Sequence, residues 1–246
     1  MRLDKFLADC AKGSRKDIKK MISKGLVTLD GKVCKNAQTP VCETSKITLC
    51  GEEIKYEKYI YLMMNKPKGY ISATEDVRKK TVLDLLCDEY RHYSLFPAGR
   101  LDIDTEGFLL LTNDGGFAHN ILSPKKHVDK TYFAKTDGCV TDEHAALFAN
   151  SVTLDDGYKT LPARLVILKS GENSSEVEIT VREGKFHQIK RMFEAIGMHV
   201  VYLKRIAMGA LYLDESLKAG EVKKLTKDDI EKITGGQNGY NQNALQ

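Results

Sequence analysis

The apolar residues at the start of the chain recur at the spacing of an amphipathic helix. Residues 3–10 place four apolar side chains on one face, and Gly13 marks the end of this helix. Ser14 and Asp17 form the pattern of a capping box, which predicts a second helix that ends at Gly25. We therefore expect the chain to begin with two short helices.

Short strands are predicted next. The apolar runs 26–29 and 32–33 flank Asp30-Gly31, a dipeptide that is typical of a tight hairpin. Residues 47–49 predict one more strand, and the polar stretch 52–58 indicates a link to the rest of the chain. The pattern therefore predicts a small N-terminal domain of two helices and a sheet.

From residue 59 onward, the apolar and alternating runs are longer and indicate a larger sheet. Strands are predicted at 59–64, 108–112, 127–134, 177–181 and 199–203. Short helices are predicted at 81–86, 117–122, 186–193 and 225–230. Many alternating strands with few helices indicate an α+β fold on a mixed, mainly antiparallel β-sheet.

These patterns divide the 246 residues into four segments. They are an N-terminal domain at 1–54, a linker at 55–58, a larger domain at 59–233, and a polar, Gly-rich tail at 234–246 that is expected to be disordered. The composition, 42% hydrophobic and 29% charged, is ordinary for a soluble globular protein.

Targeting signals and structural cysteines are not apparent. No apolar run approaches the ~20 residues of a membrane span, and the first residues lack the apolar core of a signal peptide. The six cysteines include no Cys-x-x-Cys pair, which favours free thiols over disulfides or a zinc site. We therefore expect a cytoplasmic protein without membrane contact.

Positive charge is concentrated at the N-terminus. Residues 1–51 hold nine lysines and two arginines against five acidic residues, a net charge of +6, so the rest of the chain carries −2 of the total +4. On the second predicted helix, Arg15, Lys16, Lys19 and Lys20 lie side by side, opposite the apolar face. Such a face is either simply solvated or binds a polyanion.

The segment richest in chemically reactive side chains lies at the centre of the chain. Three acids and an arginine within residues 100–106 stand directly before the apolar run 108–112, so a rigid strand is expected to hold them on a loop. A solvated acidic loop is one interpretation. A calcium loop matches the first half of the pattern but fails at its twelfth position, where Asn113 replaces a bidentate Glu.

A third interpretation rests on a family resemblance. The motif Gly-Arg-Leu-Asp-x-Asp-Thr-x-Gly at 99–107, followed by Leu-Leu-Leu-Thr-Asn-Asp-Gly at 109–115, resembles the catalytic motif of pseudouridine synthases, in the branch that modifies single uridines in ribosomal RNA. The resemblance implies a central sheet with a cleft across it. It also implies that the uracil is detached from its ribose, turned over and rejoined through carbon 5. This isomerisation needs no metal, nucleotide or redox cofactor.

The N-terminal segment carries a second resemblance. Arg-Leu-Asp-Lys-Phe-Leu at 2–7 and Lys-Gly-Leu-Val-x-Leu-Asp-Gly-Lys-Val at 24–33 are similar to the alpha-L RNA-binding domain, which precedes this synthase branch. Basic side chains on one helix face would displace counterions from phosphates and give salt-sensitive affinity. The expected RNA contacts are Lys12, Arg15, Lys16, Lys19 and Lys20.

The resemblance also implies the residues of the active site. Asp102 matches the catalytic aspartate, which acts on the sugar either as nucleophile or as base. Tyr132, in a Lys-x-Tyr pattern, matches a ring that packs against the target base. Lys190, in Glu-Gly-x-x-His-Gln-x-Lys-Arg-Met-Phe at 183–193, matches the basic residue that pairs with the aspartate. We expect Asp104 to bind backbone groups of its own loop.

Five more residues are expected to contact the substrate. Arg100 is suited to occupy the space of an extruded base or to hold a phosphate, and Leu203 matches a position that lines the site. The others are His187, Gln188 and Arg191.

The residues of the 187–193 motif most resemble those of the subgroup that acts on small-subunit (16S) ribosomal RNA. A synthase for large-subunit (23S) RNA, a non-catalytic RNA-binding or ribosome-assembly protein, and a metal-dependent hydrolase using the acids of 102–106 are the alternatives. We expect a monomer whose partner is ribosomal RNA or a ribosome-assembly intermediate.

Overall fold

The computed structural model describes all residues except 11, 43, 55–56, 92, 124–127 and 236–246. The described residues form two compact units, one of Met1–Tyr59 with Asp88–Tyr93, and one of Ile60–Cys87 with residues 94–235. Half of the predicted linker and nearly all of the predicted tail lie outside the described residues. The limits of the four predicted segments, 1–54, 55–58, 59–233 and 234–246, therefore remain predictions that the described residues do not test.

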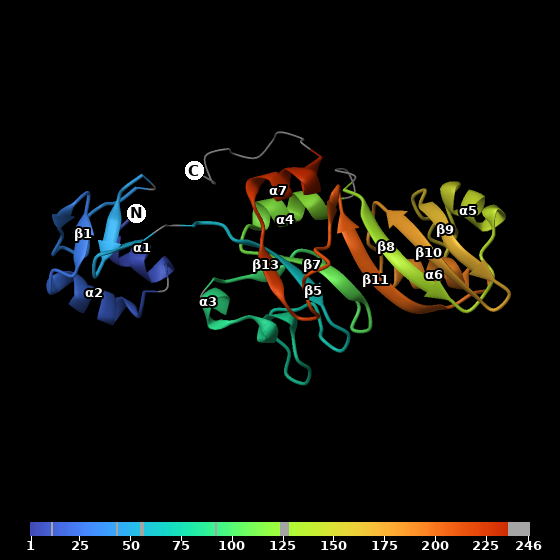
Figure 1. Ribbon diagram of the computed structural model, residues 1–246, viewed down its shortest axis with the longest axis horizontal. Helices are drawn as coiled ribbons and strands as arrows, with labels where there is room; N and C mark the ends of the chain where they lie inside the picture. The colour runs from blue at the N-terminus through green and yellow to red at the C-terminus, as the bar shows by residue number, and fades with distance from the viewer. Residues whose placement is uncertain (11, 43, 55–56, 92, 124–127, 236–246) are drawn as a thin grey trace. The chain divides into compact units, whose positions relative to one another are not determined.

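Within Met1–Tyr59, the first unit contains two helices and a small sheet (Figure 1). These are α1 (Leu3–Asp9), α2 (Arg15–Ser23), β1 (Val27–Leu29), β2 (Lys32–Val33), β3 (Ile47–Leu49) and β4 (Glu52–Ile54). The sheet is antiparallel, in the order β2-β1-β3-β4. The apolar faces of both helices pack against it through the buried side chains of Leu3, Phe6, Leu7, Ile18 and Ile22.

Two tight turns connect the strands of this small sheet. Asp30-Gly31 has backbone φ angles of +50° and +81°, the left-handed geometry of the predicted hairpin. Cys50-Gly51 forms a second such turn, with φ angles of +53° and +88°, and leads into β4. The polar link predicted from residue 52 is therefore wrong for Glu52–Ile54. Only Ile54 of this strand is buried, so the sequence shows no apolar run there.

The second unit is built on a mixed sheet of nine strands within the described residues. They are β5 (Tyr61–Lys66), β6 (Phe96–Pro97), β7 (Glu106–Thr112), β8 (Lys130–Thr136), β9 (Arg164–Gly171), β10 (Ser174–Val181), β11 (Val200–Met208), β12 (Leu211–Tyr212) and β13 (Val222–Lys224). The main path is β13-β5-β7-β11-β8-β10-β9, with β6 beside β7 and β12 beside β11. Among these strands, only β7 and β11 pair in parallel. The predicted α+β class is confirmed.

The remaining helical segments are short. They are the 3-10 turn η1 (Val82–Leu85) and the helices α3 (Asp88–Arg91), α4 (Gly115–Leu122), α5 (Asp142–Ala149), α6 (Gln188–Glu194) and α7 (Lys227–Thr234). Helices α5 and α6 pack together against the half of the sheet that contains β8, β9 and β10, where the rings of Phe148 and Phe193 meet edge to face at 5.1 Å. Among the described residues, no helix is long and apolar enough to cross a membrane.

Two predicted helices differ in detail from the structure. The helix predicted at 186–193 starts only at Gln188, because His187 adopts a left-handed conformation with φ +48° and ψ +32°. The helix predicted at 81–86 is a single 3-10 turn, which Thr81 and Asp84 cap reciprocally. Both differences concern helix ends, which local side-chain contacts decide.

The parallel contact of β7 with β11 joins the two halves of the large sheet. It is brief and pairs only Glu106 with Lys204 and Gly107 with Arg205. Gly107 has a φ angle of +96°, and a Cβ atom there would lie 2.2 Å from the carbonyl oxygen of Arg205. Only glycine therefore allows the two backbones to approach this closely.

Replacing Gly107 by Ala is therefore expected to destabilise the protein by at least about 2 kcal/mol, since it adds both backbone strain and overlap with a backbone oxygen. Gly115→Ala is the matched control. Gly115 begins α4 with no atom within 4 Å of the added methyl group, so stability should stay constant or rise by up to about 1 kcal/mol. Denaturant unfolding measures both changes. Equal stabilities of the two variants would contradict the proposed role of Gly107.

Candidate active site

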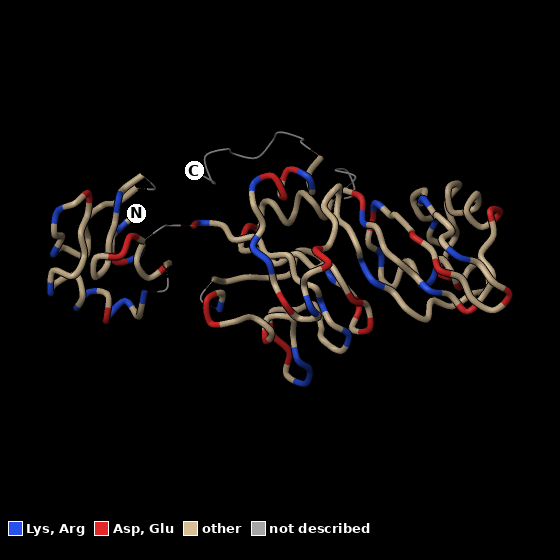
Figure 2. Tube along the Cα trace, in the orientation of Figure 1, with Lys and Arg blue, Asp and Glu red and all other residues tan. Residues whose placement is uncertain are grey.

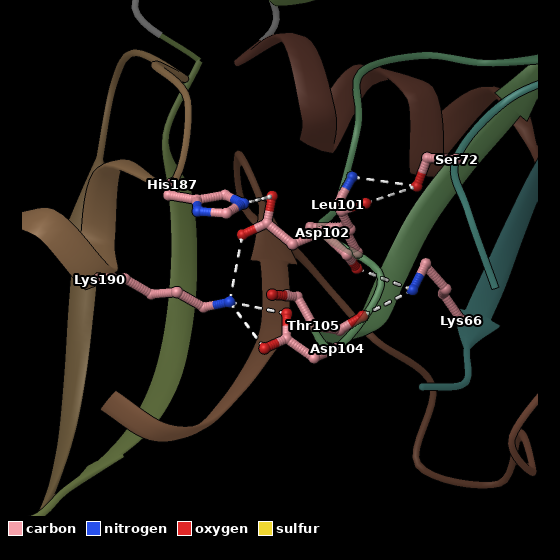
Figure 3. A network of polar contacts seen from close by, with 8 residues as sticks. All are labelled: Lys66, Ser72, Leu101, Asp102, Asp104, Thr105, His187 and Lys190. Carbon is pink, nitrogen blue, oxygen red and sulfur yellow. Dashed lines mark hydrogen bonds and ion pairs between the residues drawn. The ribbon is translucent and has the colours of Figure 1, made fainter. Parts of the chain in front are cut away.

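The acidic loop before β7 is anchored by a buried lysine. Lys66, at the end of β5, has no exposed surface, and its Nζ donates hydrogen bonds to three backbone carbonyl oxygens. The acceptors are Pro67 at 3.1 Å, Asp102 at 3.0 Å and Thr105 at 2.8 Å (Figure 3 draws the last two). An ammonium group has three donors, so this geometry satisfies all of them. Burial lowers the pKa of Lys66 to about 8, although nearby carboxylates oppose the decrease.

The segment that follows Lys66 holds the same loop at two further points. The Ser72 hydroxyl donates to the carbonyl oxygen of Leu101 at 3.0 Å and accepts from its N–H at 3.1 Å (Figure 3). The N–H of Gly69 donates to the carbonyl oxygen of Ile103 at 2.7 Å. The backbone on both sides of Asp102 is thus fixed from residues 66–72, while the Asp102 side chain keeps 28% of its surface exposed.

The Asp102 carboxylate faces two basic side chains from the other half of the sheet. Its two oxygens lie 3.6 Å from His187 Nε2 and 3.6 Å from Lys190 Nζ (Figure 3). Lys190 reaches the site from α6, and His187 immediately precedes that helix. The structure therefore brings Asp102 together with two residues that lie much later in the sequence.

Lys190 binds Asp104 more closely than it binds Asp102. Its Nζ donates to both carboxylate oxygens of Asp104, at 2.7 and 2.8 Å. Burial raises the pKa of Asp104, but the hydrogen bonds and charge of Lys190 outweigh this effect and lower the pKa overall. Besides the expected role within its own loop, Asp104 thus binds a side chain from α6, which the sequence did not indicate. Lys190 is shared between two acids.

Asp102 opens into a pocket whose far wall comes from β8 and β11. Tyr132 and Leu203 line it from these strands, and Arg100 lines it from the acidic loop. The adjoining cavity has a volume of about 650 Å³, which lies within the range of small-molecule sites. The Asp102 carboxylate, the His187 imidazole and the Tyr132 ring therefore line a cavity that can hold a planar substrate, and Lys190 lines the smaller pocket beside it.

A buried arginine supports this wall and was missed by the sequence analysis. Arg205 is 2% exposed, and its Nε donates to the carbonyl oxygen of Phe108 at 2.6 Å, which ties β11 to β7. Its Cζ lies 5.9 Å from the centre of the Tyr132 ring. Within the described residues, its Nη2 is buried without a hydrogen-bond partner. In a strand of alternating polar and apolar residues, an arginine is usually exposed. Only the resemblance of the surrounding segment to the synthase family could have indicated a role for Arg205.

Lys66 was missed for a similar reason, since a lysine in an Asn-Lys-Pro turn is usually exposed. Gln188 and Arg191, which were predicted to contact the substrate, have their polar atoms bound to other protein groups. Gln188 is buried and lines the pocket, but its side chain accepts from the N–H of Lys185 at 3.0 Å and donates to Glu183 at 2.9 Å. Its polar atoms thus stabilise the loop before α6.

Arg191 lies on a different face of α6 from Lys190. Its guanidinium pairs with Asp155 and with Asp156, the latter at 2.7 Å, and it does not line the pocket around Asp102. The structure therefore places Arg191 outside this pocket, and its expected contact with the substrate stays a prediction. Adjacent positions on a helix point about 100° apart, and the ion pairs with Asp155 and Asp156 hold the Arg191 guanidinium away from Asp102.

The acidic side chains near Asp102 are bound by other side chains of the protein. Asp104 binds Lys190, and Glu106 accepts a hydrogen bond from the Tyr202 hydroxyl at 2.8 Å. Within the described residues, no group of three or more His, Cys, Asp or Glu side chains is arranged to hold a metal ion. The hydrolase alternative would need these acids as metal ligands, and their present contacts do not favour it.

The predicted nucleic-acid contacts of the first unit are all exposed. They are Lys12, Arg15, Lys16, Lys19 and Lys20. Figure 2 shows the concentration of basic residues along α2. Ser14 caps the start of this helix, and its hydroxyl accepts from the N–H of Asp17 at 3.2 Å. The four basic side chains of α2 are exposed, whereas Ile18 and Ile22 are buried.

Comparison with known proteins agrees with this arrangement. Residues 60–195 match the RNA pseudouridylate synthase family, and residues 1–47 match the S4 domain. An uncharacterized RNA pseudouridine synthase of Bacillus subtilis (strain 168) is 48% identical over 231 residues, which cover 94% of this chain and 97% of that protein.

Two further comparisons extend over nearly the whole chain. Ribosomal small subunit pseudouridine synthase A of Escherichia coli (strain K12) is 39% identical and covers 95% of this chain and 100% of its own. A crystal structure of a pseudouridylate synthase superposes with a TM-score of 0.67 at 36% identity, over 95% of this chain and 99% of that one.

Lys66→Met is expected to release the acidic loop, because the carbonyl oxygens of Asp102 and Thr105 lose their buried donor. Amide hydrogen exchange in residues 101–105 should accelerate by at least about tenfold, since local opening becomes easier. Lys68→Met, which removes an exposed lysine two residues away, is the matched control and should leave the exchange unchanged. Equal exchange rates in the two variants would show that Lys66 does not hold the loop.

Proposed function

Because the chain belongs to the RNA pseudouridylate synthase family and carries an S4 domain, we propose that it converts a uridine of small-subunit ribosomal RNA to pseudouridine. The observation that carries this proposal is the position of Asp102 at a half-open pocket, between two basic side chains and opposite Tyr132. The full-length similarity to ribosomal small subunit pseudouridine synthase A of Escherichia coli supports the choice of RNA.

In this proposal, Asp102 acts on the ribose of the target uridine, as nucleophile or as base. The bond between uracil N1 and the sugar carbon C1′ breaks, the base turns over, and a bond forms between C5 and C1′. C5 gives up its proton and N1 ends with one, so the reaction is an isomerisation that consumes no co-reactant. Lys190 balances the negative charge of two carboxylates beside the reacting sugar.

The other residues of the pocket hold the base and its backbone. The target nucleotide must leave the RNA stack, which costs a few kcal/mol. Stacking of uracil on Tyr132 and contacts to Leu203 offset this cost, and Arg100 is placed to hold a phosphate or to occupy the vacated space. Arg205 holds Tyr132 in position from behind.

The first unit supplies affinity for RNA that does not depend on the RNA sequence. Basic side chains on α2 contact phosphates and keep the RNA near the synthase domain. A monomer that acts on a ribosome-assembly intermediate in the cytoplasm is our proposal for its physiological state. A synthase for large-subunit RNA is the alternative, and a modified uridine in that RNA would favour it.

The catalytic proposal is tested by pseudouridine mapping of ribosomal RNA from cells that lack the gene. One small-subunit uridine should lose its modification, and wild type should restore it while Asp102→Asn should not. Asp142→Asn, which alters an exposed aspartate at the start of α5, is the matched control and should restore it fully. Restoration by Asp102→Asn would exclude the assigned catalytic role. No change at any site would favour the non-catalytic RNA-binding alternative.

The RNA-binding proposal is tested by changing Lys12, Arg15, Lys16, Lys19 and Lys20 together to Gln. Affinity for ribosomal RNA should decrease at low salt, and the slope of log K against log salt should become shallower by about 0.7 to 0.9 for each phosphate that is no longer neutralised. A control variant changes five exposed lysines of the synthase domain, at 159, 169, 218, 224 and 227. Equal slopes for wild type and the α2 variant would refute the proposal.

A further inference from the structure

We propose that Phe186 and His187 form a stacking platform for the nucleobase next to the target uridine. This inference rests on the proposed function, because it requires the pocket at Asp102 to receive a nucleotide of RNA. The ligand is therefore a flanking, unpaired nucleotide of the same RNA strand, held by its aromatic face.

The first observation is the exposure of Phe186. This phenylalanine keeps 74% of its surface accessible, although the residue type is usually buried. Its ring lies parallel to that of His187, with centroids 3.8 Å apart and an angle of 16° between the planes. One face of Phe186 is thus covered by His187, and the exposed area belongs to its other face and its edges.

The second observation is the place of this ring pair. His187 Nε2 lies 3.6 Å from Asp102, and both rings line the cavity that also contains Tyr132. The stack therefore begins beside the catalytic carboxylate and continues outward to the mouth of the cavity. A base adjacent to a uridine held at Asp102 would meet the free face of Phe186.

The loop that carries the two rings is rigidly held. His187 adopts a left-handed backbone conformation that few residues other than glycine favour, and such strain tends to occur at functional positions. The side chain of Gln188 bonds both Lys185 and Glu183, and Glu183 also accepts from the N–H of Leu161 at 2.9 Å. The platform therefore exists before any ligand binds, which lowers the entropy cost of stacking.

The third observation is the charge around the rings. Lys185 and Arg100 are exposed and line the same cavity as Phe186. An aromatic face flanked by cations is the combination that binds single-stranded RNA, because the cations follow the phosphates while the ring accepts a base. When the target uridine leaves its stack, its neighbour loses a stacking partner, and Phe186 replaces it.

The first test compares Phe186→Leu with Phe186→Tyr on small-subunit ribosomal RNA purified from cells that lack the gene. The Leu variant keeps apolar volume but loses the flat ring, so kcat/KM should decrease by about tenfold to a hundredfold, mainly through KM. The Tyr variant should retain activity. The melting temperature of both should match wild type, because the ring is exposed.

Tyr212→Leu is the matched control, since Tyr212 is also an exposed aromatic residue of the synthase domain, 62% accessible, but does not line the cavity around Asp102. It should behave as wild type. Activity of Phe186→Leu equal to that of wild type would refute the platform. Absence of turnover by wild type on this RNA and on small-subunit assembly particles from the same cells would instead refute the proposed function, so the two failures are distinguishable.

The second test identifies the stacked base directly. A fragment of small-subunit RNA that spans the mapped uridine is made with an abasic site at either neighbouring nucleotide, and affinity is measured for wild type and Phe186→Leu. At one of the two positions, the abasic site should weaken binding to wild type by about tenfold or more and leave binding to the Leu variant unchanged. The same decrease in both proteins at both positions would overturn the proposal.

Discussion

The geometry of the active site depends on one buried ammonium group. Lys66 has no access to solvent, and its charge is balanced only by carbonyl dipoles and by the acids of the loop above it. A buried charge is costly unless every donor is satisfied, and here all three donors are. Because two of the acceptors belong to residues of the acidic loop, the cost of burying the lysine is offset only when that loop brings these carbonyl oxygens to Nζ. The position of Asp102 is thus coupled to the core of the sheet.

A second constraint is that no single half of the sheet contains the site. Asp102 and Asp104 precede β7, whereas Tyr132, His187 and Lys190 come from β8 and α6. The two halves meet at the short parallel contact of β7 with β11, where Gly107 permits close approach and Arg205 bonds across the junction. Small changes at this contact alter the distance between carboxylate and cation, since each group is fixed to its own half.

Much of the fold and of the site could be predicted from the sequence, and the exceptions have physical causes. Apolar periodicity identified the strand after Asp102 and the helix around Lys190, because their buried faces are continuous. It missed β4, in which only Ile54 is buried. Motif resemblance brought Asp102, Tyr132 and Lys190 to one pocket, but it could not show that Arg191 pairs with Asp155 and Asp156, because that contact depends on the rotation of α6.

The distribution of the site over two halves joined by residues far apart in the chain has a consequence for biosynthesis. Contacts of such long sequence separation slow folding, because closing long loops costs entropy before the contacts compensate for it. A nascent or partly folded chain can expose the α2 cations, which lie near its beginning, before Asp102 has acquired its basic neighbours. Assembly of the candidate site therefore requires that both halves of the sheet have folded and joined, whereas the α2 cations are complete once the first unit has folded.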